Sequence, residues 1–385
     1  MITGGRKESR MTGQTVKNPF TPNFGQVPCQ LAGRDALISE LLYAYDNAPG
    51  DPALTTILIG ARGTGKTALM TFVAQKAQAQ GWIAVNVTCI KGMLEDIYQQ
   101  AVKNAAHILD NCGKGSLSKL SVKASAGIVS AETGFSFIGD DKNANWRIRL
   151  TDVLEKLNER GTGLLITIDE VNPSLDEMIH FASVYQMFVR EERKIALLMA
   201  GLPHNVSLLL NDDSVSFLRR ASQKYLGRIE DYEVEKAFEE TAKYGGKRVT
   251  SKALKLAAEG IYGFPFMLQL VGFRSWKESG EKDEINSDDV AAGILLAKKD
   301  LETRVLKTTL DEVSDVGLQF LSAMLEDEES SALSDIAGRM GKSSAYVSNY
   351  RKRLLEQGLI EQVGRGRIKY ALPMLRSYLA EYCDI

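Results

Sequence analysis

The stretch from residue 60 to residue 67, Gly-Ala-Arg-Gly-Thr-Gly-Lys-Thr, constrains the fold of this chain more than any other. It matches the pattern G-x-x-x-x-G-K-[ST]. The apolar run 54–59 precedes it, and a segment with helical spacing of apolar residues follows it. A strand before the loop and a helix after it are the context in which this pattern binds phosphate. The stretch therefore predicts a P-loop; the alternative is a glycine-rich turn with an incidental lysine.

Each residue type in this loop has a chemical reason. Gly60, Gly63 and Gly65 let the backbone curl so that successive N–H groups point at phosphate oxygens, where a side chain would clash. Lys66 is expected to reach the β- and γ-phosphates of ATP, and Thr67 to offer its hydroxyl to Mg²⁺. The helix that follows aims its positive end at the same anion. The predicted ATP-binding residues of the loop are Gly60, Arg62, Gly63, Thr64, Gly65, Lys66, Thr67 and Ala68.

A second chemical element is the nearly continuous apolar run 163–168, which ends in Asp169 and Glu170. Such a run is typical of a central parallel strand that is buried on both faces. Asp169 is then expected to hold Mg²⁺ together with Thr67, and Glu170 to polarise the water that attacks the γ-phosphate. Acids that merely end a strand are the alternative. Their position downstream of a complete P-loop favours the catalytic interpretation.

Polar residues also follow the next buried strand, which is predicted at 195–201. His204 and Asn205 are both candidates for contact with the γ-phosphate, with a plain turn as the alternative, and we include Asn205 in the predicted ATP site. Arg219 and Arg220 precede a short strand predicted at 225–229. They are either solvated surface residues or an arginine finger for the γ-phosphate of a neighbouring subunit, because planar guanidinium donors suit phosphate.

Four alternating strand–helix units, with the P-loop on the first, predict an α/β fold. Its sheet is expected to be parallel and doubly wound, with the ligand at the carboxyl ends of the strands. This core is predicted over 27–230, after a flexible tail over 1–26. Helical patterns without strands then predict a small lid over 231–310. The segment 113–140 is interpreted as an insertion, with a hairpin and a surface loop as alternatives.

The C-terminal region, 311–385, is predicted to be a winged helix-turn-helix domain, because three short helical patterns precede two strand patterns joined by a Gly-Arg-Gly-Arg tip. Residues 339–376 hold nine Lys or Arg against two Glu, a net charge of +7 (9 − 2), whereas 311–338 hold eight acids and no base. A basic recognition helix and wing with an acidic back fit a surface for double-stranded DNA, with protein contacts as the alternative. The predicted DNA-binding residues are Tyr346, Asn349, Lys352, Arg353, Arg365 and Arg367.

Composition places few limits on function. A chain of 385 residues is long enough for two or three domains. The net charge of −2 excludes no partner, because a nucleic-acid surface is local. The four cysteines are far apart and contain no C-x-x-C pair, so they indicate neither a zinc ribbon nor a disulfide framework. No uninterrupted apolar stretch reaches ~18 residues, so no membrane partner is expected and the cytoplasm is the expected location.

Taken together, these motifs resemble an AAA+ or STAND-type P-loop ATPase fused to a winged helix, similar to the origin-recognition and archaeal-ATPase group. The resemblance runs from residue 27 to the C terminus. It implies a sheet order of 5-1-4-3-2, an adenine bordered by residues 27–34 including Arg34, and an arginine finger at Arg219 or Arg220. The motifs that carry it are GARGTGKT, LLITIDEV, AGLP at 200–203, FLRRA at 217–221, GFPFMLQLVG at 263–272 and YVSNYRKRLLEQGLI.

The lid departs from the pattern of AAA+ initiators. Those proteins carry a sensor arginine in the lid motif, whereas residues 263–270 contain Pro265 and no arginine. This segment looks more like the G-x-P lid of STAND-type ATPases.

Two functions fit these motifs. The first is a nucleotide-gated DNA-binding switch that binds ATP and Mg²⁺, hydrolyses ATP slowly and acts as a homo-oligomer or with a partner protein. The second is a STAND-like signalling NTPase whose winged helix mediates protein contacts or autoinhibition. A small-molecule P-loop kinase would leave the winged helix unexplained.

Overall fold

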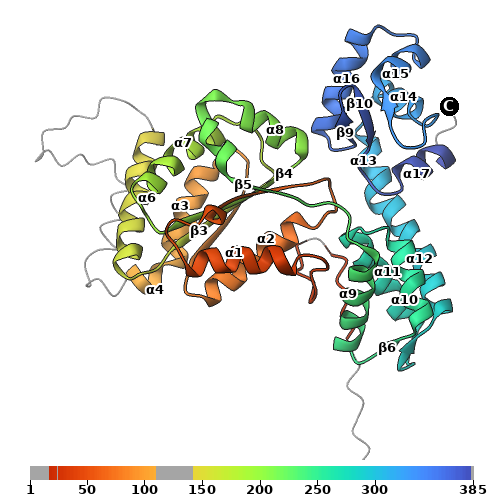
Figure 1. Ribbon diagram of the computed structural model, residues 1–385, viewed down its shortest axis with the longest axis horizontal. Helices are drawn as coiled ribbons and strands as arrows, with labels where there is room; N and C mark the ends of the chain where they lie inside the picture. The colour runs from red at the N-terminus through yellow and green to blue at the C-terminus, as the bar shows by residue number, and fades with distance from the viewer. Residues whose placement is uncertain (1–16, 24, 110–141, 383–385) are drawn as a thin grey trace, which may run out of the picture.

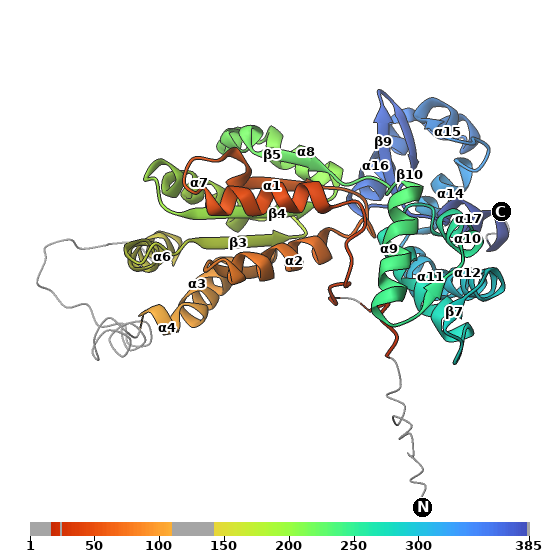
Figure 2. The same ribbon diagram turned by 60° about the horizontal axis from the view of Figure 1, so that its bottom comes forward.

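The computed structural model describes residues 17–23, 25–109 and 142–382. The predicted insertion at 113–140 lies outside these residues. Figure 1 shows an α/β body on the left, a helical body at the lower right and the blue C-terminal part above it, and Figure 2 shows the same division from another side. None of the described helices has the length and apolarity that a membrane span needs.

The α/β body is built on one parallel sheet of five strands in the order β2-β3-β4-β1-β5. Read from the other edge, this is the order 5-1-4-3-2 that the resemblance implied, so both that order and the predicted parallel core are confirmed. The strands are β1 (Thr55–Ile59), β2 (Ile83–Thr88), β3 (Leu164–Asp169), β4 (Ile195–Gly201) and β5 (Ser222–Tyr225).

Helices cover both faces of this sheet. Leu165 and Leu198 pack under α1 (Asp35–Asp46) and α2 (Lys66–Ala79). Ile166 and Leu197, their neighbours in the same strands, pack on the other face under α3 (Met93–Asn104), α6 (Lys142–Glu159) and α7 (Asp176–Arg190). Because alternate side chains enter different apolar layers, β3 and β4 read as continuous apolar runs. The helix predicted over 93–109 is divided at Ala105, and α4 (Ala106–Leu109) follows.

The last strand of the sheet lies earlier than predicted. A strand was expected at 225–229, but β5 ends at Tyr225 after α8 (Pro203–Asn211) and the 3₁₀ segment η3 (Asp213–Arg220). Leu226 still donates its backbone N–H to the carbonyl of Ile59 at 2.7 Å. Gly227 and Arg228 then leave the sheet and lead into the helical body, so the predicted strand residues are a linker between core and lid.

The lid consists of α9 (Asp231–Tyr244), α10 (Ser251–Ile261), α11 (Pro265–Glu278) and α12 (Ser287–Leu301). The expectation that it contains no strand is wrong in a small way. β6 (Arg248–Val249) and β7 (Glu284–Ile285) form a two-stranded parallel pair that ties the loops at one end of the lid together.

The N-terminal segment 17–23 packs on the lid, so the predicted flexible tail over 1–26 is wrong for these residues. Phe20 is only 1% exposed, and its ring lies 5.0 Å from that of Phe238. A Cβ at Gly272 would clash with the Phe20 ring, so a glycine is needed there. The mostly polar composition of this segment did not predict that Phe20 packs on the lid.

The C-terminal part begins after α12, which runs through a π-helical segment (Glu302–Leu306) into α13 (Lys307–Asp311). The three predicted helices and the glycine-tipped hairpin are present, and the winged-helix assignment stays a prediction. Two elements were not predicted: the strand β8 (Ser331–Ala332), which extends the hairpin to a sheet in the order β8-β10-β9, and the last helix α17 (Leu375–Tyr382). The other elements are α14 (Asp315–Ala323), α15 (Leu333–Arg339), α16 (Ser344–Glu356), β9 (Ile360–Gly364) and β10 (Arg367–Tyr370).

One apolar cluster runs without interruption from the lid into the C-terminal part. It joins Phe238 and Leu270 of the lid to Leu321, Leu354 and Ile368 of the C-terminal part. The two layers of the α/β body are separate clusters. The lid and the C-terminal domain therefore share a core with each other rather than with the sheet.

Candidate nucleotide site

The loop between β1 and α2 has the backbone conformation that its glycines predict. Gly63 and Gly65 have φ values of +79° and +83°, a region that side-chain-bearing residues rarely adopt. At Gly60, a Cβ would lie 2.7 Å from Thr64 Oγ1 and 2.8 Å from the carbonyl oxygen of Leu226. The loop therefore curls tightly between the end of the sheet and the first turn of α2.

Lys66 spans this loop from the inside. Its Nζ donates to the carbonyl oxygens of Gly60 and Ala61, both at 2.8 Å. Burial lowers the pKa of Lys66 to about 8; the neighbouring Arg62 lowers it further, while Asp169 and Glu170 oppose the shift. A buried ammonium group with carbonyls on one side and little solvent is stabilised by an anion, such as a phosphate.

Thr67 and Asp169 meet at the mouth of the loop. The Thr67 hydroxyl donates to Asp169 Oδ2 at 2.5 Å, and the other carboxylate oxygen, Oδ1, accepts the backbone N–H of Glu170 at 2.8 Å. Magnesium is held in proteins by one or two oxygen ligands together with substrate phosphates and water. The hydroxyl and carboxylate fit such an ion, and the structure brings these two predicted ligands together.

Glu170 stands directly after β3 with a φ of +55°. This left-handed conformation is uncommon for a residue with a side chain and is held here by the bond from its N–H to Asp169. The Glu170 side chain is exposed, and its charge acts on Lys66. The turn thus points a solvent-accessible carboxylate toward the same site, as expected for a residue that orients water.

The other predicted nucleotide residues are placed less directly. Asn205 donates its side-chain amide to the carbonyl of Val171 at 3.2 Å, so it lies beside the end of β3 with one donor engaged. Arg34 donates to the carbonyl of Gly227 at 3.1 Å, and burial lowers its pKa against the opposing charge of Glu233. Arg34 therefore lies at the junction of core and lid.

The two arginines proposed as a finger differ from each other. Arg219 donates from Nε to the carbonyl of Leu210 at 2.6 Å and lies 3.6 Å from Asp213, so it closes the end of α8 within its own chain. Arg220 is exposed. A finger role thus suits Arg220 better than Arg219.

The lid touches the phosphate loop through residues that sequence reasoning did not assign to the site. A Cβ built at Gly65 would lie 3.4 Å from Pro265, and one at Gly63 would lie 3.9 Å from Phe266. Both residues open α11. The Gly-Phe-Pro stretch of the lid predicted the start of a helix from the sequence. It did not indicate that this start lies beside the P-loop.

Two protein-family models match parts of this sequence. Residues 30–199 match the AAA ATPase domain, a range that contains the P-loop, Asp169 and Glu170. This part of the chain is an AAA ATPase domain. Residues 303–379 match a domain of unknown function, DUF8462. A comparison of the sequence with curated proteins finds no match.

Solved structures agree with this assignment. The ORC2 protein of Aeropyrum pernix, in ADPNP–ADP complexes, is similar with a TM-score of 0.61 and 14% identity, covering 93% of this chain and 96% of that chain. A Walker-type ATPase of Pyrococcus abyssi is similar with a TM-score of 0.59 and 14% identity, covering 91% of this chain and 96% of that chain. At such identities the likeness shows the fold alone.

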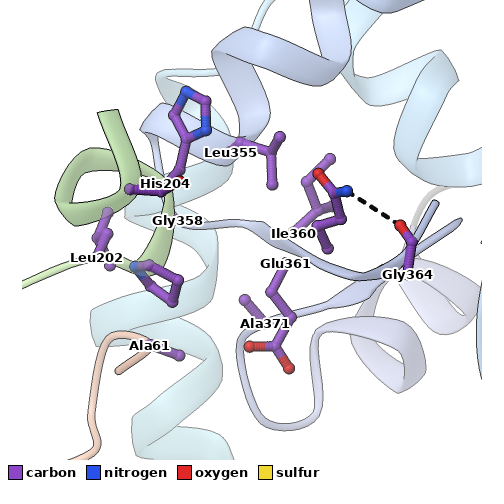
Figure 3. A pocket seen from close by; sticks show the side chains of 12 residues that line it. Ala61, Leu202, His204, Leu355, Gly358, Ile360, Glu361, Gly364 and Ala371 are labelled. Atoms are coloured by element: carbon purple, nitrogen blue, oxygen red, sulfur yellow. Dashed lines mark hydrogen bonds between the residues drawn. The ribbon is translucent and has the colours of Figure 1, made fainter. Parts of the chain in front are cut away.

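The AAA ATPase domain also contacts the C-terminal domain. Gly358, which follows α16, has a φ of +71°, and a Cβ there would lie 2.9 Å from Leu202 at the start of α8. Beside this contact is a cavity of about 370 Å³. Figure 3 shows Ala61 of the P-loop and His204 of α8 on its core side, and Ile360 and Glu361 of β9 on the other. The phosphate loop and the C-terminal hairpin thus share one cavity.

His204 lies in this wall. Burial lowers its pKa, Glu356 of α16 opposes the shift, and Arg351 and Lys352 of the same helix add to it. Its Nε2 is buried and has no hydrogen-bond partner among the described residues. His204 thus lies between the AAA ATPase domain and α16 in surroundings that favour the neutral imidazole.

The predicted DNA residues are mostly exposed, and α16, which carries four of them, also contacts α8 of the core. Tyr346, Asn349, Lys352, Arg353 and Arg365 are exposed. Arg353 lies over the ring of Tyr350 at 5.5 Å, and Lys342 over the ring of Tyr346 at 5.8 Å. Arg367 differs, because its guanidinium donates to Ser330 at 2.9 Å and thereby ties β10 to the loop before β8.

Proposed function

We propose that this chain binds ATP with Mg²⁺, hydrolyses it slowly, and uses the bound nucleotide to control the binding of double-stranded DNA by its C-terminal domain. The observation that carries the nucleotide part is the contact of Thr67 with Asp169 beside a loop spanned by Lys66. The similar ORC2 structure holds ADPNP and ADP, which supports the same ligand class here.

The proposed reaction assigns a task to each residue. The loop N–H groups and Lys66 bind the phosphates. Thr67 and Asp169 would hold a magnesium ion, which would supply positive charge to the phosphates. Glu170 orients the attacking water and accepts its proton. The water oxygen bonds to the γ-phosphorus, the bond to the β–γ bridging oxygen breaks, and ADP and phosphate leave.

Coupling to the C-terminal domain rests on the packing of three parts. The lid reaches the P-loop through Pro265, and the lid and the C-terminal domain share one apolar cluster. The C-terminal domain returns to the core at Gly358 and Leu202. A nucleotide that changes how the lid rests on the loop would therefore shift the C-terminal domain against α8.

The DNA part rests on the charge and exposure of the C-terminal domain. Its basic half is the half with exposed Arg353 and Arg365, and the acidic residues lie in the segment before it. Neutralising several phosphates releases counterions, so such binding weakens steeply with salt.

The test is fluorescence-anisotropy binding of the full chain to duplex DNA, with and without ATP and Mg²⁺, at two salt concentrations. We expect binding that falls steeply with salt and changes with ATP. Absence of DNA binding in every state would overturn the DNA part of the proposal.

A second candidate is a STAND-like signalling NTPase whose C-terminal domain mediates protein contacts or autoinhibition. The contact of Gly358 with Leu202 and the Gly-Phe-Pro lid favour it. It predicts ATP binding without salt-sensitive DNA binding, so the same experiment separates the two candidates.

A further inference from the structure

The lid offers the phosphate loop apolar atoms where a charged group is expected. Pro265 and Phe266 are the lid residues nearest to Gly65 and Gly63. The segment 263–270 contains no arginine, and Arg274, one turn further along α11, is bound to Asp300 through two bonds of 2.7 Å. A triphosphate placed at the loop would meet Lys66 and Arg62 from the core but no cation from α11.

The linker that joins core and lid carries a cation, Arg228, close to the turn before α11. Gly263 accepts the backbone N–H of Ile229 at 2.8 Å, and a Cβ at Gly263 would come within 3.0 Å of Arg228 Cβ. The linker and the turn before α11 are therefore packed together. Arg228 lies at this junction, two residues after Leu226, whose carbonyl oxygen flanks Gly60 of the P-loop.

The guanidinium of Arg228 is held in a defined position. Its Cζ lies 5.3 Å from the centroid of the Phe264 ring, and Phe264 directly precedes Pro265. Stacking of this kind occupies the flat face of a guanidinium and leaves its in-plane N–H donors free. The Arg228 side chain is exposed, and within the described residues its guanidinium lies against the Phe264 ring and forms no hydrogen bond or ion pair.

Arg34, which lies near the same linker, differs from Arg228 in its hydrogen bonds. Arg34 is directed into the same linker, but its donors are used by the carbonyls of Gly227 and Gly33. Arg228 differs from Arg34 in that it forms no such hydrogen bond within the described residues.

We propose that Arg228 is a nucleotide-binding residue that provides, from the core–lid linker, the phosphate-binding guanidinium that the lid helix lacks. This inference rests on the proposed ATP binding and adds a residue to that site. Since the linker moves with the turn before α11, a bond from Arg228 to the phosphates would also draw the lid onto the nucleotide.

The test compares ATP binding by the full chain in wild type, Arg228→Ala and Arg228→Lys by isothermal titration calorimetry with Mg²⁺. Arg248→Ala is the matched control, because Arg248 is an exposed arginine of the lid in β6, away from the loop. We expect about tenfold weaker ATP binding for Arg228→Ala and a partial recovery for Arg228→Lys, which keeps the charge but loses the planar fork. Arg248→Ala should bind like wild type.

The thermal unfolding midpoint without nucleotide should be the same in all four proteins, which separates a binding role from a structural one. Equal ATP affinity of wild type and Arg228→Ala would overturn the role of Arg228 and leave the proposed function standing. Absence of ATP binding by the wild type would instead overturn the proposed function, and this inference with it.

Discussion

The hydroxyl of Thr67 lies 2.5 Å from a carboxylate oxygen of Asp169, although 102 positions separate the two residues in the chain. The contact arises because β1 and β3 both end at the same edge of a parallel sheet, with β4 between them. Thr67 lies in the first turn of α2 and Asp169 ends β3, so neither can move away without disturbing an element that packs in the core. The pair therefore sets the position of the proposed magnesium ligands beside the phosphate loop.

Replacing Lys66 by Ala should weaken ATP binding by about 1.5–3 kcal/mol, roughly 10- to 150-fold, because charge-assisted bonds to the phosphates are lost. Calorimetric titration with ATP measures this. Lys76→Ala is the control, since Lys76 is an exposed lysine on the same helix. Unchanged affinity in Lys66→Ala would show that the loop does not bind the phosphates.

Replacing Glu170 by Gln should leave ATP binding intact and slow hydrolysis by about 10²–10⁴-fold, because the amide cannot accept the proton of the attacking water. Phosphate release under saturating ATP measures this effect. Glu192→Gln is a fitting control, because Glu192 is also exposed and also has a positive φ, +53°. Wild-type turnover in Glu170→Gln would exclude Glu170 as the base.

The lowered pKa of Lys66 predicts proton uptake on ATP binding. Burial holds this pKa at about 8 in the folded protein, whereas a lysine in an unfolded chain titrates near ~10.4. Below the folded pKa, Lys66 is protonated in both the folded and the unfolded chain. Burial of its charge then lowers the free energy of unfolding by its full amount. As pH rises from the folded toward the unfolded pKa, only the folded state loses the proton, so this group makes the free energy of unfolding rise.

Phosphate favours the charged lysine, so ATP binding near pH 9 should take up close to one proton. Calorimetry in two buffers of different ionisation enthalpy measures the number. Lys66→Arg should bind without this uptake, because a guanidinium stays charged throughout. Uptake that persists in Lys66→Arg would assign the proton to another group.

Substitutions of the two hairpin arginines should have different effects, one on DNA binding and the other on the stability of the fold. Arg365 is exposed at the tip, so Arg365→Ala should weaken DNA binding and lower the salt dependence of log affinity by about 0.9, the value for one phosphate contact. Arg367 bonds to Ser330, so Arg367→Ala should lower the free energy of unfolding by about 1 kcal/mol. DNA titrations at several salt concentrations and urea unfolding measure the two effects. Equal salt dependence in Arg365→Ala and wild type would remove Arg365 from the DNA surface.

Local patterns were sufficient for several parts of this protein. The glycines of the P-loop, the apolar runs of β3 and β4, and the three helices and hairpin of the C-terminal domain were predicted, because each depends on neighbours within one loop, strand or helix. The predicted ends of elements were wrong where a contact with a distant segment of the chain determines them. β5 ends at Tyr225 because Gly227 and Arg228 leave the sheet to join the turn at Gly263.

The sequence by itself determined the chemistry of the site, since the P-loop and the pair Asp169 and Glu170 are local motifs whose backbone geometry and residue types suit phosphate and metal. Only the tertiary structure decided which side chains are already engaged. Arg219 bonds to the end of α8, Arg367 bonds to Ser330, Phe20 anchors the N-terminal segment on the lid, and Arg228 lies against the ring of Phe264. These differences arise because identical residue types acquire different partners from distant segments, and the periodicity of a sequence does not report which distant segments meet.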